Sequence, residues 1–79
     1  MQVEAIKALL EAAISDSHIE VEVDGSHVHV LAVSPAFAGL SPVKKQQLVY
    51  GALNEQIASG AIHAVHMKTF TPDEWQQQQ

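Results

Sequence analysis

The fold is decided by the stretch over residues 39–75, which reads GLSPVKKQQLVYGALNEQIASGAIHAVHMKTFTPDEW. Ser41 is a favoured N-cap and Pro42 suits the first helical position, so we expect a helix to start there. Gly60 should end it. Gly51 lies in its interior, where close packing against a sheet would explain a glycine. The buried face of this helix is expected to contain Val43, Leu48, Val49, Ala52, Leu53 and Ile57.

The segment after this helix predicts a strand followed by a short helix. Residues 61–70 are rich in apolar and β-branched side chains, which is typical of a strand. Thr71 can cap a helix that begins at Pro72 and that brings Trp75 back onto the domain. The polyglutamine run over residues 76–79 is expected to be a disordered tail.

The first half of the chain predicts a helix and a β-hairpin. Apolar residues recur at spacings of three and four over residues 3–14, as they do on one face of a helix. Residues 19–23 alternate strictly between apolar and acidic, which indicates a strand with one wet face. Asp24-Gly25 favours a tight turn, and residues 27–33 form the returning strand. The second half of that strand is apolar on both faces, as in a central strand.

These elements give the order α-β-β-α-β-α in one domain that spans residues 1–79. A helical crossover between the second and third strands makes them parallel, whereas the hairpin pairs the first two strands antiparallel. We therefore predict an α+β fold with a three-stranded mixed sheet, strand order 1-2-3, and helices on one face.

The composition excludes several classes of function. There is no cysteine, so the chain alone cannot form a disulfide or a thiolate metal site. The chain has nine carboxylates, four lysines and no arginine, which gives a net charge of −5 and disfavours nucleic-acid binding. No apolar run is long enough for a membrane span, and no nucleophile, phosphate loop or carboxylate pair predicts catalysis. We expect a cytoplasmic, non-enzymatic protein.

Two histidines stand at matching positions of the predicted sheet. His27 opens the second strand and His63 lies near the start of the third, so parallel pairing brings both to the same end, where strands are about 4.8 Å apart. Two imidazoles there would be half of a metal site that another molecule completes. His29 shares a face with His27 and is a candidate accessory ligand. The alternative for His63 is a half-buried core histidine, and His18 and His66 are expected to be solvated.

The chain resembles the BolA family from Val3 to Trp75. The resemblance is densest at Gly39-Leu40-Ser41 with Val43-Lys44-Lys45, at Leu48-Val49-Tyr50, and at Ile62-His63-Ala64-Val65 with Lys68, Thr71-Pro72 and Trp75. The short hairpin Asp24-Gly25-Ser26-His27 is similar to that of the IbaG-like branch.

This resemblance implies a class II KH-like fold and a partnership with a monothiol glutaredoxin. It further implies a [2Fe–2S] cluster that bridges a heterodimer, with thiolates from the glutaredoxin and from glutathione. His63 would be the main ligand from this chain and His27 the second. The expected role is iron–sulfur cluster handling or iron and stress signalling. Histidine is known to ligate such iron, and it must be neutral to do so.

Two alternatives remain open from the sequence. Lys44 and Lys45, close to a helix N-terminus, form a corner that attracts anions and would serve a nucleic-acid-binding transcriptional regulator. Against this, the connector over residues 37–42 lacks the Gly-x-x-Gly pattern with which KH domains grip RNA. The same lysines and Lys68 would equally contact a protein partner, and such a partner could bind without any metal.

Overall fold

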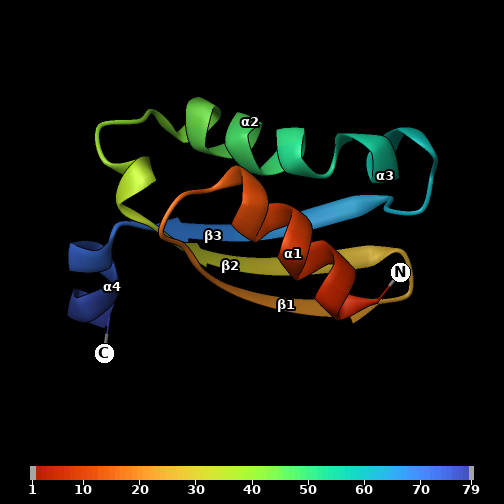
Figure 1. Ribbon diagram of the computed structural model, residues 1–79, viewed down its shortest axis with the longest axis horizontal. Coiled ribbons are helices and arrows are strands. Elements are labelled where there is room, and N and C mark those ends of the chain that lie inside the picture. Colours follow the sequence, from red (N-terminus) through yellow and green to blue (C-terminus); the bar gives the residue numbers. More distant parts are fainter. Residues whose placement is uncertain (1, 79) are drawn as a thin grey trace.

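The computed structural model describes residues 2–78, which form a three-stranded sheet and a layer of helices (Figure 1). The elements in chain order are α1 (Val3–Ala13), β1 (His18–Asp24), β2 (His27–Val33), the 3₁₀ turn η1 (Pro35–Phe37), α2 (Pro42–Ala52), α3 (Asn54–Ala58), β3 (Ala64–Phe70) and α4 (Pro72–Gln78).

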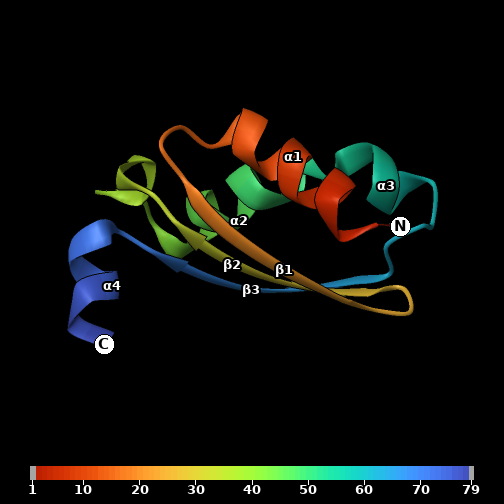
Figure 2. The ribbon, with the colours of Figure 1, turned by 60° about the horizontal axis from the view of Figure 1, so that its bottom comes forward.

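The sheet has the predicted order β1-β2-β3. β1 pairs with β2 antiparallel, and β2 pairs with β3 parallel. The two-residue hairpin between β1 and β2 uses Gly25, whose φ of 62° suits a glycine. Helices α1, α2 and α3 cover one face of the sheet, which we call the covered face, whereas α4 points away from that layer beyond the end of β3 (Figure 2). The α+β prediction is therefore confirmed, with only α4 outside the single helical layer.

The hydrophobic core lies between the covered face and the helices. The apolar face predicted for the first helix supplies its three most buried side chains, at Ile6, Leu10 and Ile14. The sheet and the remaining elements contribute Ile19, Val28, Val30, Ala32, Phe37, Val49, Leu53 and Ile62. Burial of these side chains is the main source of stability in a chain this short.

The long helix predicted over residues 42–59 is in fact two helices. The chain departs from helical geometry at Leu53, where φ is −110° and ψ is 15°, and resumes as α3. Val43 is 60% exposed and Ile57 is 36% exposed, so their predicted burial was wrong. Val43 precedes Ala52 by nine residues, or about two and a half helical turns, and therefore lies on the opposite side of α2. Ile57 belongs to the separate, shorter helix.

Gly51 does not pack closely against the sheet. A Cβ atom added there would meet nothing within 4 Å, because the residue lies on the exposed side of α2. The sequence-based explanation of this glycine by close packing is therefore wrong.

The third strand starts later than predicted. Pairing begins at Ala64, opposite His27, and residues 61–63 are irregular, with bends at Ala61 and His63. The N–H of Ile62 donates to the carbonyl of Gln56 at 3.1 Å, and the Ile62 side chain is buried. Because Ile62 is held by α3 and by the core, the segment before Ala64 cannot extend the sheet, and His63 precedes the strand.

The terminal helix α4 starts with a capping box, as Thr71 and Pro72 predict. The Thr71 N–H donates to Glu74 Oε1 at 2.8 Å, and the Glu74 N–H donates to Thr71 Oγ1 at 3.2 Å. Trp75 returns to the sheet, with its ring 5.5 Å from that of Phe70. Residues 76–78, predicted as part of a disordered tail, are helical, and Gln79 lies outside the described residues.

Among residues 2–78, no helix has the length and apolar character that crossing a membrane requires.

Candidate functional site

The two predicted ligands lie at the same end of the sheet, as parallel pairing of β2 and β3 requires. His27 is the register partner of Ala64, the residue that follows His63. The backbone N–H of His63 donates to the carbonyl of Ser26 at 2.8 Å. A backbone hydrogen bond therefore joins the segment that carries His63 to the hairpin that carries His27.

The two side chains nevertheless lie on different faces of the sheet. His27 Nδ1 is 3.5 Å from Nε2 of His66, on the face without α1, α2 and α3, which we call the open face. His63 lines a hollow of about 240 Å³ beside α2 and α3, together with Tyr50 and Ile57. Strand alternation explains the separation, since His63 precedes the open-face position of Ala64 by one residue.

His63 suits a ligand role that another molecule completes. Its side chain is exposed, and among residues 2–78 its ring makes no hydrogen bond. The rest of the hollow is mostly apolar, with Tyr50 41% exposed and Ile57 36% exposed at its rim. The half-buried core histidine that was the alternative for His63 does not match this exposed position.

The ability of this chain to hold a cluster depends on which donor side chains it offers. The described residues contain no group of three His, Cys, Asp or Glu side chains arranged to hold a metal ion. One exposed imidazole, His63, fits the role of a single ligand at a shared site. His27 fits it only if its ring turns away from His66, with which it makes a contact on the open face.

The open face also brings together three imidazoles, from His27, His29 and His66, which we call the open-face histidine group. The His29 and His66 rings are stacked, with centroids 4.6 Å apart and planes at 14°. The His27 and His66 rings are 5.7 Å apart and inclined by 22°. All three side chains are exposed.

His66 is the member of this group that sequence reasoning missed. It was expected to be solvated, and it is exposed, but its place as the register partner of His29 was not foreseen. The signal was available, because a parallel third strand that brings residue 63 near residue 27 also brings residue 66 near residue 29.

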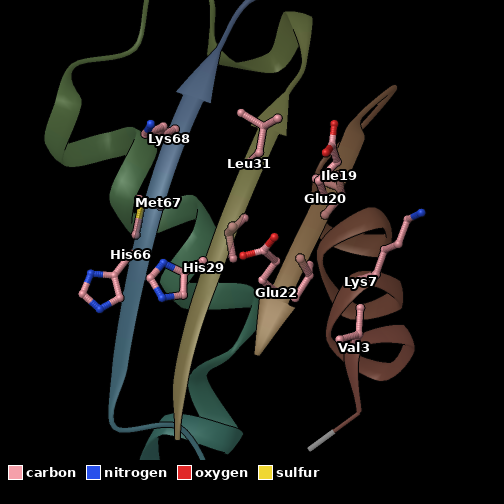
Figure 3. Close-up of a pocket in the computed structure, with 12 residues that line it drawn as sticks. Val3, Lys7, Ile19, Glu20, Glu22, His29, Leu31, His66, Met67 and Lys68 are labelled. Atoms are coloured by element: carbon pink, nitrogen blue, oxygen red, sulfur yellow. The ribbon is translucent and has the colours of Figure 1, made fainter. Parts of the chain in front are cut away.

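A larger hollow of about 590 Å³ includes part of the open face (Figure 3). Figure 3 shows Glu22, His29 and His66 side by side on three adjacent strands. They form one row in the sheet register. A carboxylate therefore adjoins the imidazoles on the open face.

The lysines predicted as partner contacts lie in two separate places. Lys44 and Lys45 belong to the first turn of α2, where the Ser41 side chain accepts a hydrogen bond from the Lys44 N–H at 3.2 Å. This turn lies at the end of the molecule away from α3 and the start of β3 (Figure 1). Lys68 is exposed on the open face, opposite Leu31. Neither place adjoins His63.

Glu74 is the described residue whose acidity is clearly shifted. The backbone N–H and the hydroxyl of Thr71 hold the pKa of Glu74 below its usual range, and the charge of Lys45 acts in the same direction. The positive charge of Lys45 thus acts on an acidic side chain of α4.

Comparison with known proteins identifies the family. Residues 5–74 match the model of the BolA-like proteins. The chain is 49% identical over 75 residues to the acid stress protein IbaG of Escherichia coli, covering 95% of this chain and 89% of that protein.

Solved structures agree with this assignment. A BolA homologue from Coxiella burnetii is 35% identical and superposes with a TM-score of 0.82, covering 96% of this chain and 97% of the other. The BolA domain of SufE1 from Arabidopsis thaliana is 31% identical with a TM-score of 0.80, covering 91% and 93%. The sequence, the fold and these relatives together show that the chain belongs to the BolA family.

Proposed function

We propose that this BolA-family chain is a non-catalytic protein that forms a [2Fe–2S]-bridged heterodimer with a monothiol glutaredoxin, and that it works in the cytoplasm in iron–sulfur cluster handling or in iron and stress signalling. The observation that carries the proposal is the exposed ring of His63 beside an apolar hollow. An imidazole there is accessible to a partner and has nonpolar surroundings on one side.

His63 is the proposed main ligand. Its backbone N–H donates to the carbonyl of Ser26, and this hydrogen bond fixes the position of the backbone from which the His63 side chain extends. Tyr50 and Ile57, partly exposed beside it, offer apolar surface that a docking protein would cover and thereby shield the ligand from water. A cluster bound at this point would supply redox chemistry or be passed on as cargo.

His27 is the proposed second ligand, and its use requires a rotation. Its ring contacts His66 in the free chain, so binding a cluster shared with His63 would break a hydrogen bond of 3.5 Å between exposed imidazoles. A contact this long and this exposed is weak, which makes the rotation inexpensive.

A nucleic-acid-binding regulator is not favoured by any observation of the fold. The lysines occur on α1, α2 and β3 and do not form one stripe, and the chain has a net charge of −5. Loss of DNA binding in a Lys44→Ala, Lys45→Ala double variant, together with a steep dependence on salt, would be needed to support that alternative.

The proposal is tested by visible absorption and circular dichroism of the chain mixed with a monothiol glutaredoxin, glutathione, iron and sulfide. We expect a spectrum distinct from that of the glutaredoxin homodimer. His63→Ala should abolish that difference, and His27→Ala should alter it. His18→Ala is the matched control, since His18 is an exposed histidine at the opposite end of β1 from the hairpin.

The two negative outcomes have different meanings. If the wild-type chain leaves the homodimer spectrum unchanged, the cluster proposal fails. If the two proteins bind equally well without iron and glutathione, and His63→Ala has no effect on affinity, the partnership is metal-free and His63 is not a ligand.

A further inference from the structure

The open-face histidine group lies in two adjacent rows of the sheet. One row contains Glu22, His29 and His66, and the next contains Asp24 and His27 with Ala64. Each row thus places a carboxylate on β1 opposite an imidazole on β2. The three exposed imidazoles thus have two carboxylates opposite them in the register, and Lys68 lies two residues beyond His66 on the same face.

The spacing of two nitrogens in this group matches that of metal ligands. His66 Nε2 and His27 Nδ1 are 3.5 Å apart. Two nitrogens bound to one tetrahedral Zn²⁺ at about 2.0–2.1 Å are separated by about 3.3–3.4 Å. The observed distance differs from this value by an amount that small side-chain rotations can remove.

We propose that His27 and His66 bind a divalent transition-metal ion, of the borderline type of Zn²⁺, Ni²⁺ or Cu²⁺, on the open face of the sheet. Imidazole is the ligand that these ions share, whereas Mg²⁺ and Ca²⁺ require oxygen ligands. Since no three donors among the described residues already converge, water completes the coordination sphere, and Asp24 and Glu22 contribute negative charge nearby.

Tautomerism of the imidazole rings accounts for the proton in the hydrogen bond between His27 and His66. A hydrogen bond between the two facing nitrogens needs a proton on one of them and a lone pair on the other. When the ion binds, the proton of the donating ring passes to that ring's other nitrogen, so both facing nitrogens offer lone pairs and both rings remain neutral.

His29 is a positioning residue for this site. Its ring stacks on that of His66 at 4.6 Å and 14°, so it restricts the rotation of His66. A flat aromatic side chain at position 29 should therefore preserve the effect, and a small one should not.

The site has one consequence that rests on the proposed function. His27 would serve both the open-face ion and the shared cluster, and its ring cannot face His66 and turn away from it at once. A bound ion therefore withholds His27 from the cluster, and among the described residues His63 would then ligate the cluster without it.

The site itself is tested by calorimetric titration of the chain alone, without glutaredoxin, using Zn²⁺ and then Ni²⁺, with Mg²⁺ as the negative probe. We expect one ion per chain, with Kd raised at least about tenfold by His66→Ala and by His27→Ala. His63→Ala and His18→Ala are the matched controls and should leave Kd unchanged. His29→Ala should weaken binding by a smaller factor, and His29→Phe should restore it.

Imidazole NMR signals supply a second readout. Sub-stoichiometric Ni²⁺ should broaden the ring protons of His27, His29 and His66 before those of His18 and His63. Equal broadening of all five histidines, absence of heat with both transition metals, or loss of binding in His63→Ala would overturn the proposal.

Two variants distinguish a failure of the ion site from a failure of the proposed function. His66→Ala removes the ion site and should leave the glutaredoxin-dependent spectrum intact, whereas His63→Ala should do the reverse. Loss of both properties in both variants would overturn the assignment of His66 to the ion site and of His63 to the cluster.

Discussion

The two faces of the sheet differ in what their side chains do. Along β2 the covered face presents Val28, Val30 and Ala32, exposed by 1%, 4% and 0%, whereas the open face presents the exposed His27 and His29. Neighbours in sequence thus serve separate purposes, because alternate side chains of a strand point in opposite directions. The covered face stabilises the fold, and the open face is free to carry polar chemistry.

The largest effect expected from this comparison is on stability. Leu53 is 0% exposed in the core, while Leu31 is half-buried on the open face. Leu53→Ala should lower the free energy of unfolding by about 2–5 kcal/mol, because the truncation leaves a cavity. Leu31→Ala is the chemically matched control and should cost less than about 1 kcal/mol. Urea denaturation of both variants measures the difference.

Similar losses in both leucine variants would mean that the open face is itself covered. Dimerisation through the sheet would have that effect, and the loss in Leu31→Ala would then depend on protein concentration.

A smaller effect on stability is expected in the helical layer. Gly51 lies within α2, where a Cβ would meet no atom within 4 Å. Gly51→Ala should therefore stabilise the chain by up to about 1 kcal/mol through helix propensity alone. Thermal unfolding measures the gain. A loss of stability would mean that the added methyl group meets neighbouring atoms and that the outer side of α2 is not open at this position.

The smallest effect is expected at α4, which belongs to neither face. Because the pKa of Glu74 is lowered by Thr71, the capping box stabilises α4 above the ordinary pKa of 4.5, and this contribution is lost as pH falls through the lower folded value. Acidification below about pH 4.5 should loosen the packing of Trp75, seen as a change in its fluorescence. Glu74→Gln keeps an acceptor for the Thr71 N–H without titrating, so its response should be flat.

Acid-induced changes of equal size in wild type and Glu74→Gln would assign the effect to other groups.

The local elements of the fold could be predicted from the sequence because each has a local cause. The alternation over residues 19–23 and the Asp24-Gly25 turn predicted the two strands of the hairpin, and Ser41 with Pro42 predicted the start of α2. The parallel crossover followed from chain connectivity, and with it the shared end of the sheet for His27 and His63.

The predictions that failed depend on tertiary contacts. Nothing local to Leu53 announces the break after α2, and the strand could not be seen to start at Ala64 without knowing that Ile62 is buried against the core. The face that His63 occupies follows from strand alternation once Ala64 is known to pair with His27. The candidate site was therefore predictable in its residues and its end of the sheet, but not in the orientation of its two imidazoles. Their role as ligands stays a prediction.

The hydrogen bond from the His63 N–H to the Ser26 carbonyl has a mechanical meaning. It connects the β1–β2 hairpin to the chain just before β3. A displacement of the backbone at one histidine is therefore transmitted to the backbone near the other. The rate of hydrogen exchange at the His63 amide should therefore rise with any binding event that displaces the hairpin and weakens this hydrogen bond.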